Sequence, residues 1–552
     1  MTASTDFDTA FRNAQQLYAK GHVHDAERAL QQLATPGEHR ETVLAALYEV
    51  YTALGRTDGA LATLEELTRE APDRLTWYAR LAALLDELGR TSDAIQHYER
   101  LLKRQPDMAD AHFNVALLYK KAKRHAQAIA AYEAAIRLGI SGAEEAYSNL
   151  GVLYSELRDA GQADEMYRRA LTINPGYIPA LFNRAGLLEE VGKRQEALDL
   201  YQRILAIQPG HADTLGRIAN ARRVTVEDRA LVGTLQSAVL ASTNDTIARE
   251  TLYFALGKAY DDLQQYDEAY KAYDAANNLG RQRNRRYDRA AVEEAFSRLV
   301  TMNDRDWVAH VGTTSTASPV FICGMFRSGS TLTEQILGVH PGVTAGGELD
   351  LLPWLVTQHL SPFPQRAPEL TAADLEPVSK QYVEYVRQLF PGARNVTDKR
   401  PNNFLNIGLI KAMFPAARII YTRRSPRDNC LSIWFQQLGG NLSYATNLAD
   451  TAHYYRQHER LMDHWQVNFG DSILTVDYDE LVRAPEPVVR RMLDFLGMDW
   501  DERCLDFERA PGQVKTASVW QVREPLHERS SGRWRNYEPM IRSIDELMQL
   551  PD

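Results

Sequence analysis

Small and hydrophobic residues recur along the first half of the chain at intervals of about 34 residues. Alanines stand at the same place in successive units, at Ala26, Ala60, Ala94, Ala128, Ala163 and Ala197. Tyrosines follow four residues after the later alanines, at Tyr98, Tyr132, Tyr167 and Tyr201. Prolines mark the ends of units at Pro72, Pro106, Pro175 and Pro209. This pattern predicts pairs of antiparallel helices that approach closely at the alanine and stop at the proline.

About six clear units cover residues 8–215, and a further unit recurs at Leu252–Ala275 after a weaker stretch. One helix pair cannot bury its apolar face alone, so successive pairs are expected to stack into a solenoid. The period and the order of glycine, alanine, tyrosine and proline resemble the tetratricopeptide repeat. We therefore predict an all-α repeat solenoid over residues 1–280 and a helical linker over residues 281–316.

The pattern changes at Pro319, where short β-branched runs begin to alternate with helical segments. The predicted strands are Val320–Cys323, Ile419–Tyr421 and Ile473–Val476. The predicted helices cover residues 330–338, 349–358, 376–390, 402–414, 426–437, 449–468 and 485–496. Strands that alternate with helices form parallel sheets covered on both faces. Residues 317–552 are therefore predicted to form an α/β domain with a parallel sheet.

Charge and composition exclude several classes of protein. The formal net charge of −10 argues against general nucleic-acid binding, which needs a basic surface, although a local basic pocket stays open. Three cysteines cannot build a disulfide framework and fit a reducing compartment. The N-terminal sequence lacks the pattern of a signal peptide, and no apolar run reaches the ~18–20 residues of a membrane span. We expect a cytoplasmic protein with no membrane span.

The strongest chemical signal is the loop after the first predicted strand. An apolar strand that enters a glycine-framed loop and opens a helix forms a nest of N–H groups for phosphate-like anions. The spacing is close to that of the nucleotide-triphosphate loop, but Ser330 occupies the lysine position and Arg327 supplies the cation. This P-loop-like motif makes the following residues candidate anion ligands: Gly324, Arg327, Ser328, Gly329, Ser330 and Thr331.

Two further segments suggest a second anion site. Arg424 follows the predicted strand Ile419–Tyr421, and Ser432 lies about two turns into the next helix. An arginine at a strand end and a serine on the following helix can hold a second phosphate together. Tyr478 follows the strand Ile473–Val476 and could contact a base or sugar. Two phosphate sites imply a nucleotide that carries phosphate at two positions.

Over residues 317–538 these motifs resemble the sulfotransferase family, in particular its tyrosylprotein branch and bacterial proteins that join tetratricopeptide repeats to such a domain. The resemblance implies an enzyme of the EC 2.8.2 type that uses 3′-phosphoadenosine 5′-phosphosulfate and releases 3′,5′-bisphosphoadenosine. The loop around Arg327 would hold the 5′-phosphate and sulfuryl oxygens. Arg424 and Ser432 would hold the 3′-phosphate, and Tyr478 would contact the nucleotide. Arg533 would belong to a terminal nucleotide clamp, at a position where tyrosylprotein members carry lysine.

The same resemblance implies the catalytic residues. Glu348 lies 21 residues after Arg327, which matches the spacing of the family's catalytic glutamate, so it would act as general base. Lys399 matches the lysine that stabilises the leaving group, and Ser518 matches a serine that assists it. A sulfuryl group carries less charge than a phosphoryl group, and no metal-ligand cluster is evident in the sequence. We therefore expect no metal requirement.

Other interpretations stay open at this point. Glu348 could merely cap a helix or lie near its first turn, where acidic residues are favoured. Lys399 could be a surface residue between charged neighbours. A repeat scaffold with a non-catalytic nucleotide-binding domain is one alternative function, and a P-loop phosphotransferase is another, although the missing lysine argues against it. The acceptor could be a protein, a carbohydrate or a small molecule. The repeat array could hold a protein or polymeric acceptor, and a homodimer is one open oligomeric state.

Overall fold

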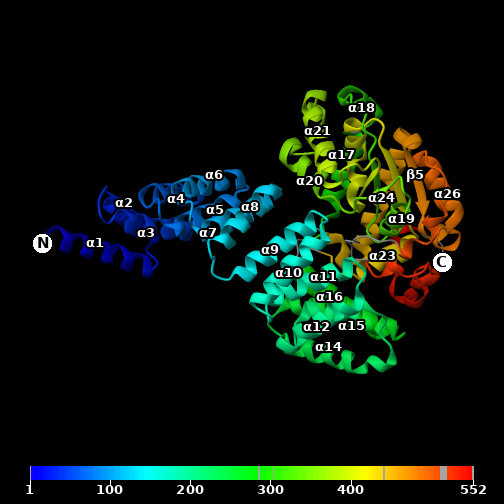
Figure 1. Cartoon of the computed structure of the whole chain (residues 1–552), viewed down its shortest axis with the longest axis horizontal. Helices are drawn as coiled ribbons and strands as arrows, with labels where there is room; N and C mark the ends of the chain where they lie inside the picture. The colour runs from blue at the N-terminus through cyan, green and yellow to red at the C-terminus, as the bar shows by residue number, and fades with distance from the viewer. Residues whose placement is uncertain are drawn as a thin grey trace. The chain divides into compact units, whose positions relative to one another are not determined.

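The computed structural model describes residues 2–283, 286–302, 304–438, 440, 442–509 and 519–549. The chain divides into two compact units, Met1–Asn183 and Arg184–Asp552 (Figure 1). The first unit is helical, and the second combines further helices with a β-sheet. The predicted fold class, an all-α repeat region followed by an α/β domain with a parallel sheet, is confirmed.

The first unit is a stack of helix pairs with its own hydrophobic core. The repeated alanines are buried there, and so are the rings of Tyr98, Tyr132 and Tyr167. A Cβ atom added to Gly151 would lie 2.5 Å from the ring of Tyr167, so the glycine leaves room for the tyrosine of the paired helix. The helices are α1 Thr2–Ala19, α2 Val23–Leu33, α3 Arg40–Ala53, α4 Thr57–Glu70, α5 Leu75–Glu87, α6 Thr91–Arg104, α7 Ala109–Lys121, α8 His125–Arg137, α9 Ala143–Glu156 and α10 Ala160–Ile173. The next helix, α11 Ile178–Glu190, crosses the boundary, and its residues from Arg184 onward, which include Glu189, belong to the second unit.

The second unit begins with helices that continue the repeat pattern. Tyr273 on the second helix of the last repeat packs against Gly257, as Tyr167 does against Gly151. The ring of Tyr273 also stacks on Phe435 with centroids 4.2 Å apart, so this repeat shares a core with the sheet domain. The helices are α12 Arg194–Ile207, α13 Ala212–Ala221, α14 Arg229–Ala241, α15 Thr246–Asp262, α16 Tyr266–Arg283, α17 Arg289–Met302 and α18 Arg305–Val311.

The sheet of the second unit is parallel throughout, with the strand order β2-β3-β1-β4-β5. The register pairs Ile322 with Lys399, Gly324 with Thr422, and Arg423 with Asp477. All carboxyl ends therefore lie at one edge, which is where open α/β sheets bind ligands. The strands are β1 Val320–Gly324, β2 Thr344–Ala345, β3 Val396–Lys399, β4 Arg418–Arg423 and β5 Ile473–Asp477.

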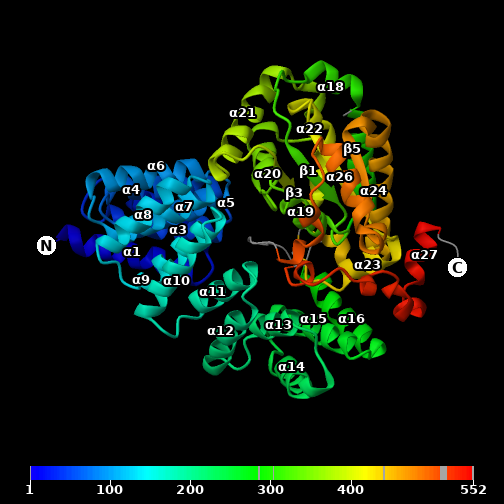
Figure 2. The same cartoon turned by 45° about the vertical axis from the view of Figure 1, so that its right-hand side comes forward.

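Helices cover both faces of the sheet (Figure 2), and alternate residues of the central strands belong to two different cores. Phe321 and Ile419 belong to the core with α20–α24, whereas Ile322 and Ile420 belong to the core with α19 and α26. The helices are α19 Ser330–Gly338, α20 Leu351–Leu355, α21 Ala372–Leu389, α22 Ile407–Met413, α23 Pro426–Trp434, α24 Leu448–Phe469, α25 Tyr478–Arg483, α26 Pro485–Leu496 and α27 Arg542–Met548. Among the residues described, no helix has both the length and the apolar character that crossing a membrane requires.

Several elements differ from the sequence prediction. The pattern misses β2, which has only two residues, and β3, whose Asp398 and Lys399 interrupt the apolar run of a buried strand. The predicted helix 349–358 is α20 continued by a π-helical turn, Val356–Leu360, and the predicted helix 402–414 begins as a 3-10 helix, Pro401–Asn406. The predicted helix 426–437 ends earlier, at Trp434.

Candidate functional site

The loop between β1 and α19 is shaped by three residues with positive φ, namely Gly324 at 151°, Arg327 at 65° and Gly329 at 101°. A Cβ atom at Gly324 would lie 2.3 Å from the carbonyl oxygen of Thr422, and one at Gly329 would lie 2.6 Å from Cδ2 of Tyr478. Both glycines are therefore required by close approach of the neighbouring strand and helix. The left-handed conformation of Arg327 is costly for a non-glycine residue.

Hydrogen bonds fix this loop to β4 and α23. The buried hydroxyl of Ser328 lies 2.7 Å from Oγ1 of Thr422, and Asn429 donates from Nδ2 to the carbonyl oxygen of Phe326 at 3.0 Å. Ser328 and Gly324 thus shape the loop from its protein side. The side chain of Ser328 is occupied by Thr422, so a contact from Ser328 to an anion would come from its backbone.

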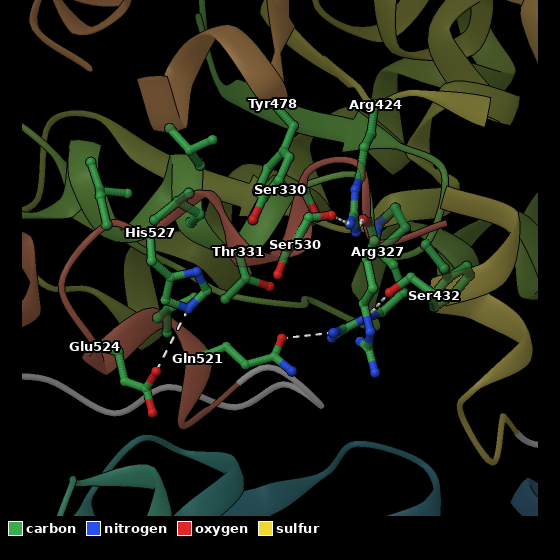
Figure 3. A pocket seen from close by; sticks show the side chains of 18 of the residues that line it. Arg327, Ser330, Thr331, Arg424, Ser432, Tyr478, Gln521, Glu524, His527 and Ser530 are labelled. Carbon is green, nitrogen blue, oxygen red and sulfur yellow. Dashed lines mark hydrogen bonds and ion pairs between the residues drawn. The ribbon is translucent and has the colours of Figure 1, made fainter. Parts of the chain in front are cut away.

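The two segments predicted to bind anions meet in space. Arg424 follows β4, and its Nη1 donates to the carbonyl oxygen of Arg327 at 3.2 Å, while its Nη2 donates to the carbonyl oxygen of Ser530. Arg327 donates from Nε to Oγ of Ser432 at 3.2 Å. The ring of Tyr478 lies 4.8 Å from the guanidinium carbon of Arg424. Figure 3 shows these side chains around one pocket.

The pocket is a cavity of about 200 Å³ within the second unit. Most of the predicted site residues line it: Arg327, Gly329, Ser330, Thr331, Glu348, Arg424, Ser432, Tyr478 and Arg533. Arg533 is also tied to the repeat helices, because it forms an ion pair with Asp261 on α15. Three arginines from distant parts of the sequence therefore converge on one cavity.

Positive charge dominates the part of the cavity that is lined by Arg327, Arg424 and Arg533, called the cationic half below. Burial, with the neighbouring charge of Arg424 as a second cause, lowers the pKa of Arg327 to about 10. Arg327 therefore stays protonated at neutral pH, although its charged form is less favoured than in water. An anion between these arginines would offset both the desolvation of Arg327 and the repulsion between like charges.

The other half of the cavity is apolar. It lies beside the hydroxyls of Ser330 and Thr331 and includes His527 and Glu524 at its edge (Figure 3). Its apolar lining consists of Leu332, Val482, Phe507, Val522, Pro525 and Leu526. A cavity with one cationic and one apolar half suits a ligand that joins anionic groups to a planar ring system.

Glu348 and Lys399 form an ion pair beside the cationic half. Nζ of Lys399 lies 2.6 Å from Oε1 of Glu348, and the lysine side chain is 0% exposed whereas that of Glu348 is 36% exposed. The backbone N–H of Lys399 also donates to the carbonyl oxygen of Gly347 at 3.0 Å. The predicted base therefore faces the cavity, and the predicted lysine reaches it only through that base.

Sequence reasoning missed Glu334, which holds the Glu348 loop in place. Glu334 is buried on α19, and its Oε1 accepts from the N–H of Gly347 at 2.9 Å and from Oγ1 of Thr397 at 2.6 Å. Glu334 lies on a helix with an apolar pattern, and that pattern predicts only that residues of the helix pack against the sheet. Only the three-dimensional approach of α19 to β3 reveals its role.

Residues 519–537, called the C-terminal segment below, contribute more to the pocket than the sequence indicated. Gln521 accepts from Nη2 of Arg327 at 2.6 Å. Asp428 on α23 accepts from the backbone N–H groups of Gly532 at 2.6 Å and Trp534 at 2.9 Å, which fixes the segment beside Arg533. Four polar residues of the segment that were not predicted as site residues line the cavity: Gln521, Glu524, His527 and Ser530. Ser518, a predicted catalytic residue, lies outside the described residues.

Within the described part of the chain, no three or more histidine, cysteine, aspartate or glutamate side chains gather as they would around a metal ion. Cys323, Cys430 and Cys504 are buried thiols. Burial raises the pKa of Cys323, so this residue at the end of β1 is a packing residue and not a nucleophile.

Comparison with family models assigns both parts of the chain. Residues 319–502 match the model of the sulfotransferase family. Tetratricopeptide-repeat models match residues 79–143, 144–177 and 250–279, and a bacterial transcriptional activator domain model matches residues 6–108. Segments that match tetratricopeptide-repeat models thus precede a C-terminal segment, residues 319–502, that is similar to the sulfotransferase family.

Curated relatives share parts of this arrangement. An uncharacterized protein of Aquifex aeolicus (strain VF5) is 28% identical over 74% of this chain and 55% of its own length. Protein-tyrosine sulfotransferase 1 of Danio rerio is 24% identical over 40% of this chain and 66% of its own length. Protein-tyrosine sulfotransferase of Drosophila melanogaster is 26% identical over 41% of this chain and 49% of its own length. The chain therefore spans from 49% to 66% of the length of these relatives.

Solved structures resemble each part separately. The sulfotransferase domain from the Synechococcus PCC 7002 olefin synthase covers 44% of this chain and 95% of that chain, with 21% identity and a TM-score of 0.33. A tetratricopeptide repeat protein from Parabacteroides merdae ATCC 43184 covers 46% of this chain and 99% of that chain, with 16% identity and a TM-score of 0.34.

Proposed function

We propose that the sulfotransferase-family domain of this chain transfers a sulfuryl group from 3′-phosphoadenosine 5′-phosphosulfate to a hydroxyl of a protein, carbohydrate or small molecule. The observation that carries this proposal is the contact between Arg424 and the backbone of Arg327, which joins the two segments predicted to bind anions in one cavity. A nucleotide with phosphates at both ends of its ribose requires two such segments side by side.

The two halves of the cavity match the two halves of the donor. Arg327 and the loop N–H groups that precede Ser330 and Thr331 would hold the 5′-phosphate and the sulfuryl oxygens. Arg424, Ser432 and Arg533 would hold the 3′-phosphate, and the apolar half would take the adenine ring. The departure from the nucleotide-triphosphate loop fits this donor, because Ser330 replaces the lysine that would contact a γ-phosphate.

Transfer requires a base, a stabilised leaving group and an in-line arrangement. Glu348 would take the proton of the acceptor hydroxyl as its oxygen attacks sulfur. The bond between sulfur and the bridging oxygen breaks, and the electron pair stays on the released 3′,5′-bisphosphoadenosine. Lys399 would offset the negative charge that develops there once Glu348 becomes protonated and loosens its ion pair. Ser518 would assist the leaving group, and none of these roles needs a metal ion.

Binding of the donor product tests the first half of the proposal. 3′,5′-bisphosphoadenosine should raise the melting temperature in the presence of EDTA, whereas ATP should do so poorly with or without Mg²⁺. At a free concentration 100-fold above Kd the product should stabilise the protein by about 2.7 kcal/mol. Stabilisation by ATP and Mg²⁺ alone would instead favour a phosphotransferase.

Transfer itself tests the second half. The protein is incubated with donor labelled in its sulfuryl group and with three acceptor classes: a tyrosine peptide, an oligosaccharide and a small phenol. The peptide is included because two relatives are protein-tyrosine sulfotransferases. Formation of labelled product from any of the three acceptor classes supports the proposed sulfotransferase activity, provided that the Glu348→Gln variant forms no such product. Product binding with no transfer to these acceptors or to a lysate of the native host would favour the non-catalytic scaffold.

The repeat array suits a protein or polymeric acceptor, because stacked repeats present extended binding surfaces. Under this proposal the first unit, Met1–Asn183, raises the effective concentration of a long acceptor at the catalytic domain. Competition tests this role with a variant of the acceptor protein in which the residue that receives the sulfuryl group is substituted. An excess of this variant should inhibit sulfation of the intact acceptor but should not inhibit sulfation of a small phenol. Equal inhibition of both reactions would contradict it.

A further inference from the structure

The C-terminal segment has little regular structure of its own. Between Val519 and Tyr537 it forms only short 3-10 helices, Gln521–Arg523, Glu528–Ser530 and the beginning of Arg533–Met540. Such helices make few internal hydrogen bonds, so contacts with other elements must fix the course of the segment. Figure 2 shows it, in orange to red, between the helices α12–α16 and the sheet.

The first end of the segment is anchored on repeat helices. The indole N–H of Trp520 donates to Oε1 of Glu189 on α11 at 3.2 Å, and the guanidinium of Arg194 on α12 lies 4.5 Å from the centre of the Trp520 ring. Arg523 donates from Nη2 to the carbonyl oxygen of Glu190 at 2.6 Å. The side chain of Glu189 is only 3% exposed, so its hydrogen bond to Trp520 is made away from water.

The second end of the segment is anchored on the last repeat. Arg533 and Tyr537 both donate to the carboxylate of Asp261 at the end of α15. The ring of Tyr537 also packs edge-on against Tyr266 of α16, with centroids 5.5 Å apart. Each anchor is therefore a carboxylate of a repeat helix that accepts hydrogen bonds from the segment.

Two residues of the segment that lie between these anchors contact Arg327 and Arg424 in the cavity. Gln521 follows Trp520 directly and accepts from Arg327, while Ser530 accepts from Arg424 through its carbonyl oxygen. We propose that Glu189 and Asp261 are positioning residues for donor binding, because they hold the C-terminal segment where it orients Arg327, Arg424 and Arg533. This inference rests on the proposed function. It makes the last repeats part of the donor site, in addition to any role in holding an acceptor.

One consequence concerns truncation experiments. Removal of residues 1–280 would delete both anchoring carboxylates together with the helices that share a core with the sheet. A loss of activity in such a truncated chain would not report on acceptor binding. Point substitutions in the full chain separate the two roles.

The test measures binding of 3′,5′-bisphosphoadenosine by calorimetry in the full chain and in Trp520→Phe, Glu189→Ala and Asp261→Ala. Trp520→Phe keeps an aromatic ring beside Arg194 and removes the indole N–H that donates to Glu189, together with the five-membered ring. The matched control is Glu196→Ala on α12, an exposed glutamate paired with Lys193. We expect the three variants to weaken binding about 5- to 30-fold, equivalent to one or two kcal/mol, with the control unchanged. The KM for the acceptor at saturating donor should stay constant.

A double-mutant cycle separates positioning from a general loss of stability. If Trp520 acts through Gln521, the pair Trp520→Phe and Gln521→Ala should bind the product as Gln521→Ala does alone. Unchanged affinity in properly folded Trp520→Phe and Asp261→Ala would overturn the inference, and so would additive effects in the cycle. Absence of binding by the unsubstituted protein would instead overturn the proposed function, and the inference with it.

Discussion

Nζ of the fully buried Lys399 donates to Oε1 of Glu348 at 2.6 Å, so the candidate base and the candidate leaving-group cation form an ion pair with each other. The lysine lies at the end of β3, and the glutamate lies on the loop after β2. Protonation of Glu348 during transfer would remove the negative partner of Lys399. The ammonium would then be available to a new negative charge at the moment that charge forms.

This pairing determines which substitution of Glu348 is informative. Glu348→Gln keeps an oxygen that accepts from Lys399 but cannot take a proton. We expect turnover to fall by at least ~10²-fold while the affinity for 3′,5′-bisphosphoadenosine stays the same. Steady-state kinetics and calorimetry measure the two quantities. Glu348→Ala is less informative, because it leaves the buried ammonium of Lys399 without its partner.

A matched control lies two residues further on the same loop. Asp350 is mostly exposed and pairs with Arg400 outside the cavity. Asp350→Asn removes a carboxylate of the same loop and should leave turnover within about twofold of the parent. If both amide variants lose turnover equally, the loop needs its charge for folding, and Glu348 is not the base.

The loop after β1 and Arg424 could be singled out from the sequence because each belongs to a local motif, a glycine-framed turn and a strand end, whereas Glu348 was singled out only through the resemblance to a family; the fold brings all three to one cavity. Contacts between distant segments have no such signal. Gln521 belongs to a stretch without hydrophobic period, and only the fold brings it to Arg327. The role of Glu334 could not be predicted for the same reason. A carboxylate on an otherwise apolar helix face does not indicate that its partners are Gly347 and Thr397.

The backbone of Arg327 makes glycine, and not alanine, the suitable replacement. Its φ of 65° is accessible to glycine without strain, so Arg327→Gly removes the guanidinium and keeps the loop conformation. We expect affinity for 3′,5′-bisphosphoadenosine to fall about 10- to 100-fold, as for the loss of a charged hydrogen bond. The melting temperature of the unliganded protein should not fall, because a buried charge beside Arg424 is removed.

Arg158 provides the control for that experiment. It is also a non-glycine residue with positive φ, 64°, and lies in the turn between α9 and α10 of the first unit. Arg158→Gly repeats the backbone change far along the sequence from the anion loop and should leave product binding unaltered. Equal loss of binding in both variants would attribute the effect to the glycine and not to the cation.

Glu334 should affect turnover through the position of Glu348. Glu334→Ala leaves the N–H of Gly347 without its acceptor, so we expect a loss of about 1–3 kcal/mol in the free energy of unfolding and a lower kcat. Glu334→Gln keeps an acceptor oxygen and should restore most of both quantities. Product affinity should change little in either variant, since the anion loop is held separately by Thr422. A fall in affinity larger than the fall in kcat would contradict this division.

Asp398, which precedes Lys399 on β3, gives the stability of the protein a defined dependence on pH. It is buried and accepts from the hydroxyl of Tyr382 at 2.8 Å, and burial raises its pKa to about 7 despite that hydrogen bond. Its ordinary pKa is about 4, so between pH 4 and 7 the native state holds a proton that the unfolded chain has lost. The resulting stability is fully present below pH 4, decreases as pH rises, and is gone above pH 7.

Asp398→Asn should remove this dependence, because the amide resembles the protonated carboxyl and does not ionise. The free energy of unfolding of the variant minus that of the parent should increase by up to about 1.4 kcal/mol for each pH unit between pH 4 and 7, and then level off. Urea unfolding followed by tryptophan fluorescence at pH 5, 6, 7 and 8 measures this difference, in which the titration of all other groups cancels. Parallel stability curves for the two proteins would mean that the carboxyl of Asp398 is already ionised in the native state at pH 5.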